Sequence, residues 1–423
     1  MSTITTTADP VASTDAAARL QRRLLPLYAS VMLQNVALWV PVEKLFMNEI
    51  GFDPASVGVM AAAYALVAPL LEIPSGIMAD RWSRRGVLVI GGVSLIASVT
   101  IGAVSTNVVT YIVAAMFLGV FFAMQSGTLD AVVYDTVVEE TGSSDGFERR
   151  IGRVHMFESV ALVSSALIGG WIAAVTFPRL TYFLTVPFLA LSVVALGMFR
   201  EPRLHKAEAP QSLRSHVNTT YRTILQGGCL VPIITLMVLT SLLLSMLFEF
   251  GALWLVALAA PAILYGPHFA GLTSALGIGG LLGGRVRLTN PPTLGLIVGL
   301  MALSSLTLTT SHSAVVVTGA QVLLAILIVT ISIFLTAQLH DAIPSNIRSG
   351  VASGVGTFTW IAFLPLSLIF GYVSKQAGVY TAGWMITGIV VVMGFLLVRL
   401  VLDLRSRVAG GGEPTACPAL ATS

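Results

Sequence analysis

Twelve long apolar stretches divide this chain, and each is long enough to cross a membrane as a helix. A hydrocarbon core about 30 Å thick needs about 20 apolar residues in helical form. Only 10% of the residues are charged, against the roughly 25% usual in soluble domains. The stretches run over about residues 24–47, 55–79, 86–104, 107–133, 152–177, 180–199, 230–256, 263–284, 293–310, 314–338, 349–371 and 380–402. The chain is therefore predicted to be an all-α membrane protein with twelve transmembrane helices.

The predicted spans fall into two groups of six. The spacing of Gly76, Asp80 and Arg81 recurs at the equivalent helix of the second group, with the acid lost, as expected of two pseudo-symmetric bundles related by an internal repeat. The predicted segments are a disordered tail (1–23), a first six-helix bundle (24–199), a linker with a short amphipathic helix (200–229), a second six-helix bundle (230–402) and a second disordered tail (403–423).

The distribution of Lys and Arg predicts the orientation. With the N-terminus inside, 20 of the 23 basic residues lie on the inner side, and Lys44, Arg179 and Lys375 lie outside. Cytoplasmic loops carry such an excess, so both termini are expected in the cytoplasm of a cell whose plasma or inner membrane holds the protein. Cys229 and Cys417 then meet a reducing compartment, where no disulfide is expected. The net charge of +3 reflects this topology and predicts no nucleic-acid partner.

The loop between the second and third stretches holds the densest ordered set of charges in the chain. It reads Gly76-x-Met78-Ala79-Asp80-Arg81-x-Ser83-Arg84-Arg85. This resembles the signature hairpin of the major facilitator superfamily, G-x-L-A-D-R-x-G-R-[RK]. The preceding Glu72-Ile73-Pro74-Ser75 resembles the E-x-P-[ST] entry of the drug-efflux members, although Ala115 stands where those members carry an arginine.

The resemblance implies two bundles around a central cavity that opens alternately to either side. It implies an efflux carrier that exchanges protons for a small, amphipathic or hydrophobic compound, with membrane lipid around a monomer. No metal-ligand spacing, phosphate loop or nucleotide fingerprint occurs, so no enzyme, cofactor or metal is expected. Two alternatives stay open: a carrier for one specific metabolite, importing or exporting it, and a membrane sensor that transports nothing.

A gate on the cytoplasmic side is predicted around the hairpin. Asp130 and Asp135 lie near the inner end of the fourth stretch and are natural counter-charges for Arg84 and Arg85. In the superfamily the hairpin aspartate faces the start of the eleventh helix, which would place Asp80 near residue 349. The predicted gate motif comprises Gly76, Asp80, Arg81, Arg84, Arg85, Asp130 and Asp135.

Acids inside the membrane are the candidates for proton coupling, because ionised groups are costly there and are usually functional. His155 and Glu158 lie three residues apart, on one helical face; they form either a proton relay or a pair at the water interface. Glu72 is either a proton site or an acceptor for nearby backbone donors. The candidates are Glu43, Glu72, His155, Glu158 and Glu249.

The first stretch carries the candidates for contact with the transported compound. Asn35, Trp39 and Glu43 recur every four residues, so they are predicted on one face of a continuous helix. Asn35, Trp39 and Glu249 are expected to line the cavity, which the resemblance builds from the first, fourth, seventh and tenth helices. Lys44 lies at the same level as Glu249, so the two are predicted to pair as an outer gate, although Glu43 and Lys44 could merely mark the membrane rim.

Overall fold

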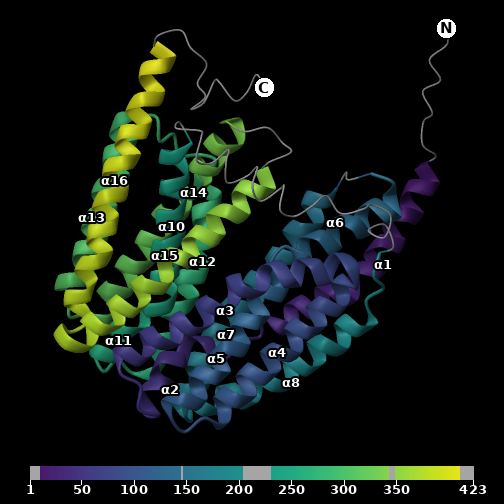
Figure 1. Ribbon diagram of the computed structural model, residues 1–423, viewed down its shortest axis with the longest axis horizontal. Helices are drawn as coiled ribbons and strands as arrows, with labels where there is room; N and C mark the ends of the chain where they lie inside the picture. Colours follow the sequence, from purple (N-terminus) through teal and green to yellow (C-terminus); the bar gives the residue numbers. More distant parts are fainter. Residues whose placement is uncertain (1–9, 144–145, 203–229, 343–347, 410–423) are drawn as a thin grey trace.

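The computed structural model describes residues 10–143, 146–202, 230–342 and 348–409, and within these ranges the regular structure is entirely helical, which confirms the fold class. The helices form two bundles that touch at one end and diverge toward the end at which the first helix begins, at residue 10, and the last helix finishes, at residue 409 (Figure 1). We call these the closed end and the open end.

The first bundle contains the helices that precede residue 200. They are α1 (Pro10–Gln34), η1 (Val40–Val42), α2 (Glu43–Glu49), α3 (Pro54–Arg81), α4 (Arg84–Val104), α5 (Val108–Gln125), α6 (Thr128–Thr141), α7 (Phe147–Val175) and α8 (Pro178–Met198). The second bundle comprises α10 (Val231–Phe250), α11 (Ala252–Ala257), η3 (Ala262–Leu264), α12 (Tyr265–Gly283), α13 (Pro291–Thr310), α14 (Ala314–Ala342), α15 (Arg348–Ala377) and α16 (Val379–Ala409).

Ten segments of the described chain are long and apolar enough to span a membrane. The predicted first and eighth spans are not among them. They correspond to α1 with its continuation α2, which is interrupted, and to α12. Both nevertheless pack within the bundles: α1 lies against α8 and α12 against α14.

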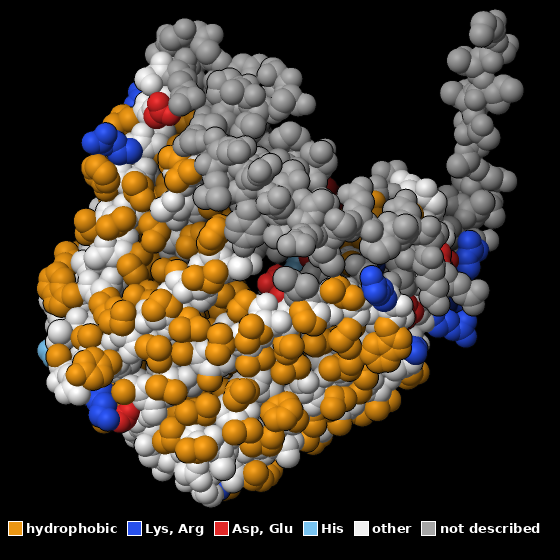
Figure 2. Space-filling view, viewed as in Figure 1, with side chains coloured by type: hydrophobic (Ala, Val, Ile, Leu, Met, Phe, Trp, Pro, Cys, Tyr) orange, Lys and Arg blue, Asp and Glu red, His pale blue; other side chains and the backbone are white. Residues whose placement is uncertain are grey.

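The outer surface of both bundles is apolar, and charges gather toward the ends of the molecule (Figure 2). Val109, Met198 and Val315 are each at least 70% exposed on this surface. Apolar surface of this extent is unusual on a soluble monomer. It fits the hydrocarbon interior of a bilayer, as the composition predicts.

Two predicted continuous helices are broken, and a third is divided into two helices at a single residue. The first breaks after Gln34, where the Asn35 amide donates to the Val31 carbonyl (2.9 Å) and ends the helix. The fourth breaks after Gln125, because Gly127 has a left-handed backbone with φ of +67°, which a glycine adopts without steric cost. The seventh divides at Gly251 into α10 and α11. Asn35, Trp39 and Glu43 therefore do not share one helical face, which corrects that prediction.

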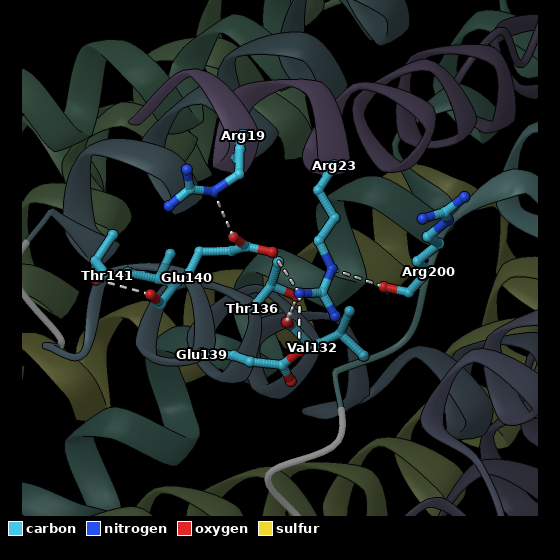
Figure 3. Close-up of polar contacts among 9 residues, drawn as sticks. Arg19, Arg23, Val132, Thr136, Glu139, Glu140, Thr141 and Arg200 are labelled. Carbon is cyan, nitrogen blue, oxygen red and sulfur yellow. Dashed lines mark hydrogen bonds and ion pairs between the residues drawn. The ribbon is translucent and has the colours of Figure 1, made fainter. Parts of the chain in front are cut away.

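The predicted N-terminal tail is also corrected, because α1 begins at Pro10 and not near residue 24. Leu20 and Leu24 are fully buried. Arg23 extends from α1 to the carboxylates of Glu139 (2.9 Å) and Glu140 (2.6 Å) on α6, and to the Arg200 carbonyl (3.1 Å; Figure 3). These hydrogen bonds and the buried leucines hold α1 against the rest of the first bundle.

The predicted C-terminal tail differs from the structure, and the predicted linker helix lies outside the described residues. The helix α16 continues to Ala409, beyond the predicted start of the C-terminal tail at residue 403. The amphipathic helix of the linker, Cys229 and Cys417 lie outside the described residues.

The closed end is built from two helix crossings between the bundles, α3 with α15 and α7 with α12. A Cβ atom on Gly58 would lie 2.5 Å from the Ser367 carbonyl oxygen, and one on Gly266 would lie 2.7 Å from the Ala166 carbonyl oxygen. Small residues allow backbones to approach this closely in membranes. The glycines of these crossings therefore determine how tightly the closed end can shut.

Candidate functional site

A cavity of about 770 Å³ lies between the two bundles. Most of its wall is apolar or aromatic, and its polar groups include Gln34, Asn35, Glu43, Glu72 and Glu249. The remaining lining residues are Ala37, Trp39, Val40, Met60, Tyr64, Ala68, Leu95, Leu118, Phe121, Phe122, Ala123, Ser126, Leu162, Thr185, Leu189, Leu244, Ser245, Phe248, Phe269, Gly356 and Trp360. A cavity of this size that is lined mainly by apolar side chains with few polar groups is typical of small-molecule sites.

The break in the first helix brings the polar groups of that segment to the cavity. After Gln34 the chain runs without helix to Trp39, and Pro41 opens the short turn that leads into α2. Gln34 accepts a hydrogen bond from Gln125 of α5 (3.1 Å). Asn35, Trp39 and Glu43 line the same cavity although they do not follow one helical stripe. Among the described lining residues none comes from α14, the tenth predicted span; α3, α12 and α15 contribute instead.

At the closed end of the cavity lies an ion cluster of Glu43, Lys44 and Glu249. The Lys44 Nζ atom lies 2.8 Å from Glu43 Oε2 and 2.6 Å from Glu249 Oε1. Only 4% of the Lys44 side chain is exposed. Glu249 belongs to the second bundle, so the ammonium joins the two halves. The contact between Lys44 and Glu249 that the sequence suggested is therefore present in the structure.

Three tyrosines complete the polar partners of the two carboxylates. Tyr64 of α3 donates to Glu249 (2.8 Å), and Tyr111 of α5 donates to Glu43 (2.9 Å). The Tyr111 hydroxyl lies 2.7 Å from that of Tyr182 on α8. Each carboxylate thus has an ammonium and a phenol as partners. Buried charges persist when they are paired and hydrogen-bonded in this way.

The cluster holds two acids and one base. If all three are ionised, it carries one negative charge more than Lys44 can balance, in surroundings where unbalanced charge is costly. One proton added to either carboxylate would make the cluster neutral. The arrangement can therefore take up and release a cation or a proton at the point where the bundles meet.

The hairpin between α3 and α4 lies at the open end. The Ser83 hydroxyl accepts a hydrogen bond from the Gly86 backbone N–H (2.8 Å), which begins α4. Arg84 pairs with Asp135 of α6, as predicted. Arg85 donates to the carbonyls of Gly197 (3.3 Å) and Phe199 (3.1 Å), and it contacts neither Asp130 nor Asp135 in the described part of the chain. The hairpin thus joins helices within the first bundle.

Among the residues that the structure describes, Gly76, Arg81 and Asp130 make no such contact. Arg81 and Asp130 are exposed, and a Cβ on Gly76 would meet nothing within 4 Å. The side chain of Asp80, and those around residue 349, lie outside the described part of the structure.

The remaining proton-coupling candidates lie at different places. Glu72 lines the cavity. His155 and Glu158 on α7 form the predicted pair, with 2.9 Å between Nδ1 and Oε2, but 60% of the histidine side chain is exposed and neither residue lines the cavity. The structure therefore brings together Glu43, Lys44 and Glu249, and leaves the histidine pair on the surface.

Sequence reasoning missed the tyrosines of the cluster and Glu201. Glu201 accepts hydrogen bonds from the Ser83 hydroxyl (2.6 Å) and the Arg84 backbone N–H (2.6 Å), so it fixes the start of α4. A carboxylate is favoured there by the helix dipole. The sequence did offer a signal for Glu201, because this acid follows the sixth predicted span directly and so lies on the same side of the membrane as the hairpin. For Tyr64, Tyr111 and Tyr182 the sequence holds no signal, because aromatic residues are common at any depth of a bundle.

A second, exposed ion pair crosses between the bundles at the closed end. Asp53 caps α3, and its carboxylate lies 2.7 Å from the Lys375 Nζ atom at the end of α15. The hydrogen bond from Lys375, and that from the Ser56 backbone N–H, lower the pKa of Asp53 from 3.8 to about 2. A lowered pKa in the folded state adds stability above the unfolded-state pKa, and this stability disappears as the pH falls from about 4 to about 2.

Asp53→Asn is expected to lower the melting temperature only slightly at pH 6, because exposed pairs contribute about 0–1 kcal/mol and asparagine still caps a helix. The difference from wild type should shrink as the pH falls through the window from about 4 to about 2. Thermal melts of the detergent-solubilised protein across this range measure it. Asp53→Ala is the comparison, since it also removes the cap and should cost about 1 kcal/mol more. A difference that grows at acid pH would contradict the assignment.

Known structures share this architecture of two bundles. The nucleoside transporter NupG matches with a TM-score of 0.69 at 13% identity, over 90% of this chain and 98% of its own. A bacterial homologue of the lysosomal transporter Spinster, inward-facing and unoccupied, matches with a TM-score of 0.67 at 12% identity, over 92% and 96%. The xylose transporter XylE from E. coli, inward-open, matches with a TM-score of 0.63 at 12% identity, over 90% and 95%.

A sequence relative is "Multidrug resistance protein 1" of Bacillus subtilis (strain 168), which is 24% identical over 169 residues. The match covers 40% of this chain and 42% of the relative, so the chain spans less than half of that protein's length. The family model of the Major Facilitator Superfamily matches residues 24–360. Two helical bundles, a cavity between them and this match together show that the chain belongs to the Major Facilitator Superfamily, a family of membrane transporters and not of enzymes.

Proposed function

We propose that this protein is a secondary active transporter that exports small amphipathic or hydrophobic compounds in exchange for protons. The observation that carries the proposal is the position of the ion cluster, which forms part of the wall of a large, mostly apolar cavity. An apolar wall favours compounds that are themselves largely apolar, and the unbalanced carboxylate offers a place for a proton. The relative named for multidrug resistance is consistent with this substrate class.

The proposed orientation places the open end in the cytoplasm of a plasma or inner membrane. The excess of Lys and Arg on the side of the termini supports it, and two of the similar solved structures are described as inward-facing or inward-open. In this orientation the cavity is accessible from the cytoplasm, and the closed end, with Lys44 and Glu249, is the shut outer gate. The protein would act as a monomer, with its apolar surface in contact with lipid.

The ion cluster then couples the movement of the proton to that of the exported compound as the cavity opens alternately to either side of the membrane. In the closed state Lys44 holds Glu249 across the bundle interface. Protonation of Glu43 or Glu249 would remove the unbalanced charge and weaken one of the two ammonium contacts. A ligand shifts such an equilibrium only by its difference in affinity for the two states. If the proton binds more tightly to one of the two states and the solute to the other, binding of either one would therefore weaken binding of the other.

Glu249→Gln is expected to separate coupling from transport. In proteoliposomes, uptake driven by a pH gradient should fall by about tenfold or more, because Lys44 and Glu43 then balance each other and the cluster no longer holds an acid in excess. Counterflow of the same compound without a gradient should persist. Glu158→Gln is the matched control, because Glu158 lies on the surface with His155 and lines no part of the cavity. If Glu158→Gln uncouples transport and Glu249→Gln does not, the histidine pair is the coupling site.

A carrier for one specific metabolite is the second candidate. It is favoured by the polar amides of Gln34 and Asn35 in the cavity wall and by fold neighbours that are named for nucleosides and xylose. Counterflow with a panel of lipophilic compounds, sugars and nucleosides distinguishes the two. Exchange of one polar solute and of none of the lipophilic compounds would favour the specific carrier. Failure of every solute to exchange would favour the non-transporting sensor.

A further inference from the structure

A second, smaller cavity of about 160 Å³ lies at the closed end, between α2 and the start of α3 in one bundle and α11, α15 and the start of α16 in the other. Asn48, Ala257 and Gly378 line it and are exposed, so they form its rim. Lys44 and Ser374 line it and are buried, so they form its floor. We call this cavity the outer pocket.

The ion cluster separates the outer pocket from the large cavity. Lys44 lines the outer pocket, and its two partners, Glu43 and Glu249, line the large cavity. The Lys44 Nζ atom is bound to both carboxylates at 2.8 and 2.6 Å. One layer of charged side chains therefore stands between a space that faces the open end and a space that faces the opposite side of the membrane.

The floor of the outer pocket has unused capacity for hydrogen bonds. The Ser374 hydroxyl is buried and has no hydrogen-bond partner within the described part of the chain. Two N–H groups of Lys44 serve the carboxylates. The third can reach the Met47 sulfur at 3.8 Å, which is a weak acceptor. Each water takes about 30 Å³ in the liquid and needs two to four polar partners in a protein. The pocket has room for several.

We propose that the outer pocket is a water-filled path by which protons from the outer side reach the ion cluster while the gate is closed to solute. This inference rests on the proposed function. The proton passes along water to the Lys44 end of the cluster and finally adds to a carboxylate oxygen of Glu249 or Glu43, which neutralises the unbalanced charge. The solute remains in the large cavity, because the paired side chains of the ion cluster close the passage between the two cavities.

Other charged or titratable groups surround this path on each packed helix. Tyr64, which lines the large cavity, donates to Glu249, and Tyr111 donates to Glu43 and lies against the Tyr182 hydroxyl. Arg179 lies over the Phe46 ring and donates to the Ser105 carbonyl (3.0 Å). At the rim, Asp53 lines the pocket and is held by Lys375. Each of these groups has its own partner, whereas the cluster has an acid in excess.

Cysteine labelling tests whether water reaches the floor of the pocket. Ser374→Cys is made in a background with Cys229 and Cys417 replaced by serine, and a membrane-impermeant methanethiosulfonate is added to the outer side of oriented vesicles. We expect labelling at least about tenfold faster than at Ser367→Cys, because a thiol reacts only where it is accessible. Ser367 is the matched control: it lies on the same helix, is fully buried and lines neither pocket.

Ser245→Cys, which lines the large cavity, reports whether the gate opens during the assay. It should be labelled from the inner side and not from the outer side. Equal outer labelling at Ser245→Cys and Ser374→Cys would overturn the proposal, because the reagent would then enter through an open gate. Labelling of Ser374→Cys no faster than that of Ser367→Cys would overturn it as well.

Filling the pocket tests its role in coupling. Ser374→Leu should lower gradient-driven flux by about tenfold or more, as expected when a proton path is blocked, while counterflow without a gradient stays within about twofold of wild type. Gradient-driven flux equal to wild type, or an equal loss of both activities, would overturn the inference. Wild-type flux that does not depend on the pH gradient would instead overturn the proposed function. The labelling comparison would still decide whether water fills the outer pocket.

Discussion

Lys44→Met is expected to destabilise the protein by about 3–5 kcal/mol, the cost of removing one partner from a buried ion pair. Methionine keeps most of the side-chain length but removes the ammonium that lies within 2.8 Å of both Glu43 and Glu249. Two carboxylates then face each other across the bundle interface with only tyrosine hydroxyls as partners. The measurement is the melting temperature of the detergent-solubilised protein, read as the temperature at which heating removes the monodisperse peak in size-exclusion chromatography.

The control for this variant is Lys375→Met. Lys375 also pairs with a carboxylate across the two bundles at 2.7 Å, but 49% of its side chain is exposed. Its loss should cost about 1 kcal/mol or less. The double variant Lys44→Met with Glu249→Gln should recover part of the stability, because it removes the repulsion between the two acids. Equal effects of Lys44→Met and Lys375→Met would show that the cluster is hydrated and not buried.

The sequence predicts the architecture because the constraint is simple. A bilayer admits only segments that satisfy their own backbone hydrogen bonds, so apolar length reveals the spans. Charges are rare enough that their partners can be guessed: Arg84 with Asp135, and Lys44 with Glu249, are both present. These pairs are predictable because each joins opposite charges at the same depth.

The local backbone was harder to predict. The break after Gln34 leaves the Asn35 amide bonded to the Val31 carbonyl, in a segment whose composition is that of an unbroken helix. The break at Gly127 depends on a left-handed backbone, which a glycine permits but does not require. Many glycines in this chain stay helical. Tertiary packing decides which of them bend, and a single sequence does not show that packing.

The burial of the tyrosines also depends on tertiary structure. Tyr64, Tyr111 and Tyr182 come from three different helices, and only the tertiary structure brings Tyr64 to Glu249 and Tyr111 to Glu43 and Tyr182. The outer pocket has the same origin, because its floor combines Lys44 of the first bundle with Ser374 of the second. Features that lie between the bundles need the relative position of the bundles, which neither periodicity nor charge provides.

Gly266→Ala is expected to open the closed end. The added Cβ would lie 2.7 Å from the Ala166 carbonyl oxygen and 3.3 Å from the Gly170 Cα atom. The contacted atoms belong to the backbone of α7, which has no rotamer by which to move away. Overpacking of this kind costs about 1–3 kcal/mol. Because the clash exists only while α7 and α12 cross tightly, that cost should shift the population toward the state with the outer end open, by about 5- to 150-fold.

Gly277→Ala is the control on the same helix, since a Cβ at Gly277 would meet nothing within 4 Å. Spin labels at Thr176 and Ile263 measure the separation of the bundles by pulsed electron resonance. Both residues are exposed and lie at the closed end of the molecule, Thr176 just after α7 and Ile263 in η3. Gly266→Ala should add a longer distance to the distribution, and Gly277→Ala should leave the distribution as in wild type. If both variants fold and give the wild-type distribution, the α7–α12 crossing does not limit opening. Gly58→Ala, at the crossing of α3 with α15, would then test whether the second crossing alone holds the closed end, because a Cβ there would lie 2.5 Å from the Ser367 carbonyl oxygen.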